Sequence, residues 1–337
     1  CPRGLLKKVR KEAMDLGFKP LFAQEFEWFN FRENSEDIND AGFHNPTPIT
    51  RGMFGYSIIR ASRNREFIND IFDLMNLFKV PLEGIHTETG PGVYEAAILY
   101  DDILEAADRA VLFKTGLKEI GNFHEIIPSF MAKWSDDYPG CSGHLHQSLW
   151  KDGKNIFFDS QAKNKISPLM EHYIAGVLHC LPDILPLYAP TVNSYKRLTE
   201  GAWAPTTLTW GIDNRTCALR AIPGSEKSSR LEMRVPGSDA NPYLAMAASL
   251  ASGLYGIKNK LPLKTPPTQG NGYKETQFGK LSRHLGEASQ KMKESKVALE
   301  LFGENFVRHF CKTREWEWQQ HLNAVSDWEL KRYFEII

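Results

Sequence analysis

The sequence lacks an excess of charge of either sign. Its 337 residues include 41 Lys and Arg and 41 Asp and Glu, so the formal net charge at pH 7 is zero. Proteins that bind nucleic acids usually carry a basic field, so we expect no nucleic acid partner. The 42% hydrophobic and 24% charged residues are typical of a globular protein. The length allows one large domain or two ordinary ones.

The sequence is also poor in cysteine and has no long apolar run. Its five cysteines are scattered and form no CxxC pair, which argues against a disulfide framework or a zinc site and favours reduced thiols. They are Cys1, Cys141, Cys180, Cys217 and Cys311. No apolar run approaches the ~20 residues that cross a bilayer, and the first residues lack the apolar segment of a signal peptide. We therefore expect a cytoplasmic protein without a membrane partner.

Strand and helix patterns are mixed without a regular βαβ rhythm, which predicts an α+β fold. Apolar spacing predicts helices over 5–16, 67–78, 101–120, 165–188 with a break at Pro182, 241–261, 281–293, 297–310 and in the tail from Trp328. Strands are expected over 20–31 and 94–99, and loops over 33–45 and 262–272.

One stretch, Arg-Leu-Glu-Met-Arg, alternates charged and apolar residues. Because strand side chains alternate between two faces, Arg230, Glu232 and Arg234 share one face while the apolar residues can enter a core. Taken alone, such a face could simply be solvated. Arg215 and Arg220 lie upstream, however, and guanidinium groups match the oxygens of phosphates and carboxylates. The arginines around one glutamate therefore predict a site for a polyanion.

Three further clusters precede this stretch. The segment 23–28 places two carboxylates on one strand face, 143–148 does the same with two histidines, and 86–95 holds two glutamates around a Pro-Gly pair. In this order and spacing, the clusters and the arginine-rich stretch resemble the catalytic domain of class I glutamine synthetases. The resemblance runs from about Pro2 to the C-terminus.

The resemblance implies a fold and an assembly. The expected α+β fold is that of this catalytic domain, a curved antiparallel sheet that forms an active-site funnel backed by helices, over residues 1–337. The small N-terminal β-grasp domain of the family, which supplies a latch aspartate to a neighbouring site, is expected to be absent from this chain. Family members stack hexameric rings, so self-association into rings, a dodecamer, is expected.

The resemblance also implies two divalent metal sites. The first matches Glu27, Glu88 and Glu95, and the second, beside the nucleotide phosphates, matches Glu25, His144 and Glu232. These residue types suit Mg²⁺ or Mn²⁺, which prefer oxygen ligands, and Mn²⁺ tolerates imidazole. Converging carboxylates would repel one another unless cations neutralised them. Any one of the glutamates alone could be an ordinary surface residue.

Further matches concern ATP and the amino-acid substrate. ATP would be bound by His146, Ser148, Arg220 and Arg230, and the amino acid by Gly140, Arg197 and Arg234, while Arg215 would act on the transferred phosphoryl group. Phosphoryl transfer depends on such positioning and on stabilising charge at the oxygens. From residue type alone, Arg197 could be a loop-surface charge and His146 a hydrogen-bonded core histidine.

Two positions depart from the family pattern. The family's Asn-Gly-Ser-Gly before the histidine pair is here Pro139-Gly140-Cys141-Ser142, where only Gly140 keeps its place. Trp203 stands where ammonia-using members carry a flap glutamate that takes a proton from bound ammonium. An indole cannot take that proton, but it could close the lid or pack against an alkylammonium chain. This substitution resembles the branch that ligates glutamate to amines. Alternatively, Trp203 is only a packing aromatic of the lid.

The implied activity is that of a two-step ATP-dependent ligase. ATP would phosphorylate the γ-carboxylate of glutamate, and ammonia or a primary amine would then attack the acyl phosphate. Two alternatives stay open: a non-catalytic relative such as lengsin of the eye lens, and a related enzyme that uses another acid or amine. The complete set of metal ligands weighs against the first. Tyr273 lies near the tyrosine that some family members adenylylate, in a context that does not establish this modification.

Overall fold

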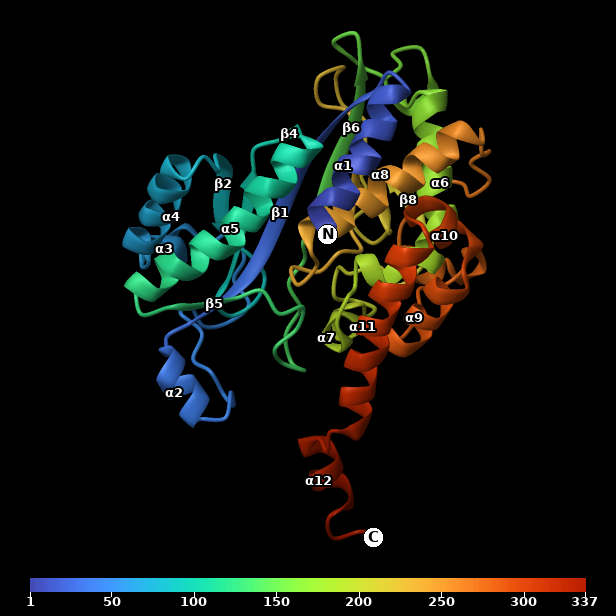
Figure 1. Ribbon diagram of the computed structural model, residues 1–337. Coiled ribbons are helices and arrows are strands. Elements are labelled where there is room, and N and C mark those ends of the chain that lie inside the picture. Colours follow the sequence, from blue (N-terminus) through green and yellow to red (C-terminus); the bar gives the residue numbers. More distant parts are fainter.

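The computed structural model describes residues 1–337, and a mixed sheet of ten strands runs through its centre (Figure 1). The strands are β1 (Lys19–Phe31), β2 (Leu82–Thr87), β3 (Val93–Ile98), β4 (Asp101–Asp102), β5 (Ile127–Ser129), β6 (Leu145–Lys151), β7 (Lys154–Asn155), β8 (Trp210–Ile212), β9 (Leu219–Ile222) and β10 (Arg230–Met233). The main strand order is β2-β3-β1-β6-β10-β9-β8. The strand pairs are antiparallel except β8 with β9, so the expected antiparallel sheet contains one parallel pair at its edge.

Strand β1 joins two halves of the sheet. Its first residues, 19–24, pair with β6, and residues 25–29 pair with β3. The change of partner falls between Gln24 and Glu25, so the acidic pair predicted from the sequence lies at the seam between the halves. The predicted alternation is confirmed, because Phe26 and Trp28 are buried on the opposite face from Glu25 and Glu27.

Helices back the sheet, which confirms the predicted α+β fold. They are α1 (Pro2–Asp15), α2 (Ser35–Asp40), α3 (Ile58–Ser62), α4 (Arg65–Leu77), α5 (Ile103–Phe123), α6 (Pro168–Ile184), α7 (Val192–Arg197), α8 (Pro242–Lys258), α9 (Leu285–Glu294), α10 (Lys296–Phe302), α11 (Glu304–Asn323) and α12 (Asp327–Tyr333). Helix α5 packs on β1 and α4, while α8 packs between α1 and α6 (Figure 1). The sheet is therefore supported by two helical groups, one behind each half.

Helices α6 and α8 approach closely because glycines meet at their contact. A Cβ on Gly176 would lie 2.3 Å from the backbone oxygen of Ser252 and 2.5 Å from the nitrogen of Gly256. Helix α8 starts within the range predicted for it, with Pro242 in the first turn and the Asn241 side chain accepting a hydrogen bond from Leu244 N. This close pair anchors the larger core beneath the sheet.

Three of the local predictions that differ from the structure have an identifiable local cause. Helix α2 lies inside the segment predicted as a loop, because the Asn34 side chain caps its first turn. Helix α6 continues through Pro182, so the predicted break there is wrong; the proline sits in the last turn, where the helix ends anyway at Ile184. The helix predicted over 297–310 is divided at Gly303, whose φ of 82° ends α10 and starts α11.

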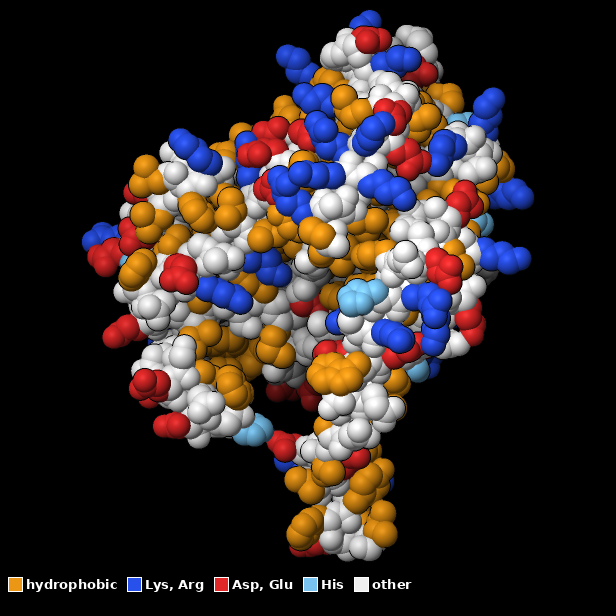
Figure 2. Space-filling model, in the orientation of Figure 1, with side chains coloured by type: hydrophobic (Ala, Val, Ile, Leu, Met, Phe, Trp, Pro, Cys, Tyr) orange, Lys and Arg blue, Asp and Glu red, His pale blue; other side chains and the backbone are white.

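The C-terminal tail projects from the body of the molecule. The end of α11 and all of α12 extend away from the other elements (Figure 1). Apolar side chains cover this projection (Figure 2), among them Trp328, Phe334 and Ile337, which are 64%, 81% and 94% exposed. Among all the helices, none combines the length and the apolar character that crossing a membrane requires.

Candidate active site

A cavity of about 550 Å³ lies over the seam of the sheet. Most of the predicted site residues line it, namely Glu25, Glu27, Glu88, Glu95, Gly140, His144, His146, Trp203, Arg215, Arg220, Arg230 and Arg234. Glu232 is buried behind them at 1% exposure. Ser148 lines an adjoining cavity of about 280 Å³ that shares Glu25, His146 and Arg230 with the first. Arg197 lines neither cavity. The structure therefore brings together side chains from five segments that are distant in the sequence.

The first acidic cluster places like charges against each other. Glu27 on β1 stands directly opposite Glu95 on β3, an arrangement that destabilises antiparallel strands when both groups are ionised. Burial, followed by repulsion from Glu27 and Glu25, raises the pKa of Glu95 to about 9. Burial also raises the pKa of Glu27. An oxygen of Glu88, just after β2, is buried without a hydrogen-bond partner. These carboxyl groups fit a hard divalent cation, which would replace their protons.

The second cluster combines carboxylates with a neutral imidazole. His144, just before β6, has its Nδ1 atom 3.5 Å from Glu25 Oε2 and 3.4 Å from Glu232 Oε1. Burial, then Arg234, lowers the pKa of His144 to about 4, so the ring is neutral at pH 7, the state in which imidazole binds metals. The other ring nitrogen of His144 is buried without a partner. This donor set also fits a divalent cation.

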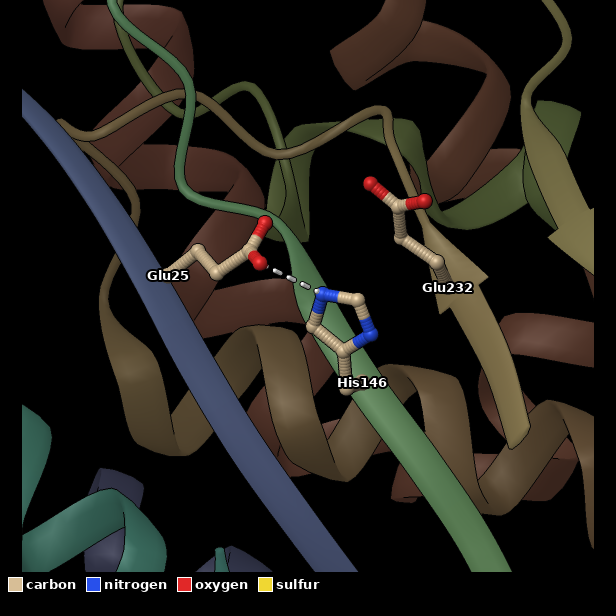
Figure 3. Close-up of side chains that lie close together, drawn as sticks. All are labelled: Glu25, His146 and Glu232. Carbon is tan, nitrogen blue, oxygen red and sulfur yellow. Dashed lines mark ion pairs between the residues drawn. The ribbon is translucent and has the colours of Figure 1, made fainter. Parts of the chain in front are cut away.

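His146 lies beside the same carboxylates, but one of its ring nitrogens accepts a hydrogen bond from Arg230. The ligand atoms of Glu25, His146 and Glu232 lie within 4.8 Å of one another (Figure 3), and His146 Nε2 is 3.1 Å from Glu25 Oε1. Arg230 Nε donates a hydrogen bond of 3.1 Å to His146 Nδ1. Because Nδ1 must carry a lone pair to accept it, the neutral ring holds its proton on Nε2, facing Glu25. His144 is therefore better suited as the metal ligand, and His146 as a link to Arg230.

Glu232 is ionised although it is buried. Arg220 Nη1 lies 3.0 Å from Glu232 Oε2, and Arg234 forms an ion pair with Oε1. Burial alone would raise the pKa of Glu232, but Arg234, His144 and His146 bring it down to about 2. Strand register explains the contact, because Glu232 on β10 is paired with Arg220 on β9 and with His146 on β6.

Arg234 and Arg215 differ in how firmly the structure holds their side chains. Arg234 is 3% exposed, donates a hydrogen bond of 3.0 Å to the backbone oxygen of Arg215, and bonds the backbone oxygen of Trp203 at 3.3 Å. Arg215 lies in a turn before β9, with its side chain exposed at the cavity wall. Arg234 is thus fixed in place, whereas Arg215 can reach over a bound molecule.

Trp203 stands at the mouth of the cavity in an unusual conformation. Its side chain is 59% exposed and its φ is 55°, a left-handed conformation that is uncommon for an aromatic residue. Gly201, two residues earlier, has a φ of 82°. The hydrogen bond from Arg234 to Trp203 O ties this segment to the arginine cluster. The indole is therefore presented to the opening of the cavity rather than packed in a core.

Gly140 and Arg197 are packed against each other at the back of the cavity wall. A Cβ on Gly140 would lie 2.2 Å from the backbone oxygen of Ala132 and 2.9 Å from Arg197 Cγ, so close packing alone requires glycine there. Arg197 is 2% exposed, which excludes the alternative of a loop-surface charge. Its predicted contact with a substrate carboxylate stays a prediction.

Sequence reasoning assigned no role to six residues of the cavity wall. These are Tyr56, His86, Thr89, Pro139, Ser142 and Ala202. The rings of Tyr56 and His86 lie 4.8 Å apart, and burial, then Glu88, raises the pKa of Tyr56 to about 12. Tyr56 lies in an irregular loop without a periodic pattern, so nothing in the local sequence pointed to it. His86 lies in the segment 86–95, where only the two glutamates were assigned a role. Tyr273 is 7% exposed with its hydroxyl buried, which gives no support to its modification.

Comparison with known proteins identifies the family of this chain. The family model described as glutamine synthetase, catalytic domain, matches residues 1–333. A Dictyostelium discoideum protein named type-1 glutamine synthetase 2 is 52% identical over 342 residues, which cover 100% of this chain and 65% of that protein. A Pseudomonas glutamate–isopropylamine ligase is 38% identical, covering 100% of this chain and 74% of that protein.

A solved structure described as a GmaS/ADP complex superposes with a TM-score of 0.88 at 28% identity. The superposition covers 99% of this chain and 77% of the other. The chain thus spans about two thirds to three quarters of the length of these relatives. The family match over almost the whole chain, together with the 52% identity, shows that this chain belongs to the glutamine synthetase family and carries its catalytic domain.

Proposed function

We propose that this protein is an ATP-dependent ligase that joins the γ-carboxylate of glutamate to ammonia or a primary amine through γ-glutamyl phosphate. One observation carries the proposal: a single cavity combines two carboxylate clusters with arginines from β9, β10 and the preceding turn. Phosphoryl transfer between two anions needs both cations to neutralise the oxygens and fixed donors to position them. The names of the relatives, a glutamine synthetase and a glutamate–isopropylamine ligase, support the same reaction class.

Two divalent ions, Mg²⁺ or Mn²⁺, belong to this proposal. One would be held by Glu27, Glu88 and Glu95, and the other by Glu25, His144 and Glu232. When bound, the ions supply positive charge that neutralises the carboxylates and the phosphate oxygens of ATP. The raised pKa of Glu95 and the neutral His144 are the properties of this chain that favour them.

The remaining residues would position the reactants. Arg220 and Arg230 lie on the neighbouring strands β9 and β10, where Arg220 lines the first cavity and Arg230 lines both. They would bind the phosphates of ATP, with His146 orienting Arg230. Ser148 in the adjoining cavity would contact the nucleotide. Arg215 would stabilise the transferred phosphoryl group, and Arg234 would bind a carboxylate of glutamate.

The acceptor is the finer part of the proposal. Ammonium is small and needs a negative group to hold it and to take its proton, and Trp203 offers none. An indole face can instead pack against the chain of an alkylammonium ion. We therefore propose that a primary amine with an apolar chain is a better acceptor than ammonia.

The test is the rate of ADP release by the full-length oligomer with glutamate and ammonium, methylamine or putrescine. At equal concentrations of free amine, kcat/KM should be higher for the amines, and Trp203→Glu should shift the preference towards ammonia. Ammonia preferred by the unmodified protein would reject the amine proposal and leave a glutamine synthetase. No ADP release with any acceptor would reject the ligase proposal in favour of a structural relative such as lengsin. No contact in the structure supports that alternative.

The cellular context is also proposed. We propose that residues 1–337 form one catalytic domain, that copies assemble into stacked rings as a dodecamer, and that the protein acts in the cytoplasm. The exposed apolar tail supports association, and the cysteines, all free thiols, support a reducing compartment.

A further inference from the structure

Arg197 is a charged residue buried among backbone carbonyls. It ends helix α7, is 2% exposed, and its guanidinium donates three hydrogen bonds. Nη1 bonds Val235 O at 2.9 Å, while Nη2 bonds Arg234 O at 3.1 Å and Ser142 Oγ at 2.9 Å. A buried cation is costly unless its hydrogen bonds are used. These bonds are directed at the wall of the active site and none of their partners is a carboxylate, while Nε is buried without a partner.

Ser142 connects Arg197 to Glu27. The Ser142 amide donates a hydrogen bond of 2.7 Å to Glu27 Oε2. Its carbonyl accepts the Glu27 amide at 2.9 Å and the Ser238 hydroxyl at 2.7 Å. Its own hydroxyl accepts the bond from Arg197. This one residue therefore fixes both the backbone and the carboxylate of Glu27, and Arg197 fixes the residue.

The helix that carries Arg197 is anchored at its other end to the same wall. Asp239 accepts hydrogen bonds from Thr191 Oγ1 at 2.9 Å and from Ser194 Oγ, in the cap and first turn of α7. Ser238, next to it, also bonds the backbone oxygen of Glu27, and its own carbonyl accepts a bond of 2.6 Å from Lys114 Nζ. Helix α7 is thus held at its start by Asp239 and at its end by the hydrogen bonds of Arg197. A helix fixed in this way can hold the guanidinium in one position.

We propose that Arg197 is a positioning residue that acts through Ser142 to hold the carboxylate of Glu27 in the direction that the first metal site requires. The hydrogen bond from Arg197 to Ser142 is a feature of this chain's own sequence. The family pattern has glycine at this position, and glycine has no hydroxyl to accept the bond. The inference rests on one part of the proposed function, the metal ion at Glu27. It does not depend on which acceptor the enzyme uses.

The test measures Mn²⁺ binding to the full-length oligomer without nucleotide or glutamate, by electron paramagnetic resonance and calorimetry. Arg197→Lys and Ser142→Ala should each weaken one class of Mn²⁺ sites about 10-fold, as loss of a support to a metal ligand typically does. The class that depends on His144 should stay within about twofold. The double variant should bind no more weakly than either single variant, because both changes remove the same contact.

Arg109→Lys is the matched control. Arg109 also donates three side-chain hydrogen bonds, to Glu105, Leu99 and Asp101, and its side chain is 14% exposed, but it lines no part of the cavity. Its variant should lower the melting temperature without changing Mn²⁺ affinity. This control separates positioning of Glu27 from a general loss of stability.

Each result decides between the two proposals. If the unmodified protein binds no Mn²⁺, the metal sites of the proposed function fail and the inference fails with them. If it binds Mn²⁺ and the two variants bind it equally well, only the positioning role is rejected. Arg197→Lys with unchanged Mn²⁺ affinity and a raised KM for glutamate would show instead that Arg197 contacts the substrate.

Discussion

Two glutamates of the candidate site, Glu95 in the cavity wall and Glu232 behind it, differ in protonation because their neighbours differ. Glu232 has Arg234, His144 and His146 as neighbours, and they bring its pKa down to about 2 although burial alone would raise it. Glu95 has carboxyl groups as neighbours, and burial with their repulsion raises its pKa to about 9. The protein itself therefore balances the charge of Glu232. The charge of Glu95 needs a partner from outside, which a divalent cation can provide.

This contrast predicts a pH dependence of stability in metal-free protein. Because the folded-state pKa of Glu95 is raised from 4.5 to about 9, the native state binds more protons than the unfolded state between these values. The contribution of Glu95 is therefore fully present below pH 4.5 and is lost as the pH rises towards 9. In chelator, the melting temperature of the unmodified protein should fall between pH 6 and 9 more steeply than that of Glu95→Gln. Equal slopes for the two proteins would contradict the raised pKa, and saturating Mn²⁺ should reduce the difference.

The exposed Arg215 and the fixed Arg234 should give distinct kinetic defects. Arg215→Ala should leave ATP binding nearly intact and lower kcat, with a barrier increase of ~3 kcal/mol, as for a lost transition-state donor. Arg234→Ala should instead raise KM for glutamate. Steady-state kinetics with varied ATP and glutamate separate these effects. Indistinguishable defects in the two variants would reject the division of roles.

At the scale of elements, sequence patterns correctly predicted the features that depend on residues close together in the chain. Alternation placed Glu25 and Glu27 on one face of β1, and apolar spacing predicted a helix over 241–261, where α8 runs over Pro242–Lys258. The burial of Arg197 had no local signal, because it depends on carbonyl groups of Arg234 and Val235 that fold back from a distant segment. Tyr56 was missed for the same reason, since its place in the cavity depends on an irregular loop.

Close packing of α6 against α8 gives a prediction about an element. Gly176→Ala should destabilise the fold by about 1–3 kcal/mol, the usual cost of overpacking, because the new Cβ would meet Ser252 O at 2.3 Å. Thermal melting of the apo protein is the measurement. Gly84→Ala in β2, where nothing lies within 4 Å of the new Cβ, is the control and should melt near the unmodified temperature. A loss in Gly176→Ala no larger than in this control would show that the helices can separate without cost.

At the scale of the whole molecule, the seam in the sheet explains how one cavity gathers residues from positions 25 to 234. Strand β1 pairs with β6 and β3 in succession, so carboxylates from one half of the sheet meet histidines and arginines from the other. The family resemblance, rather than periodicity, assigned these residues to one site. The pairing of strands supplies the physical reason that they meet.

The projecting tail gives a prediction about assembly. Val325, Trp328 and Phe334 are 72%, 64% and 81% exposed, and apolar side chains gathered on a projection favour burial against another protein surface. We expect that surface to belong to a second copy of the chain, as the proposed rings require. Deleting residues 325–337 or changing Trp328→Ser together with Phe334→Ser should therefore reduce the mass measured by sedimentation velocity, and the double substitution should leave the circular dichroism unchanged. Lys331→Gln, on the same helix and also exposed, should leave the mass unaltered. Full-size assemblies formed by both tail variants would show that the contacts between copies lie elsewhere, and a monomeric unmodified protein would reject self-association itself.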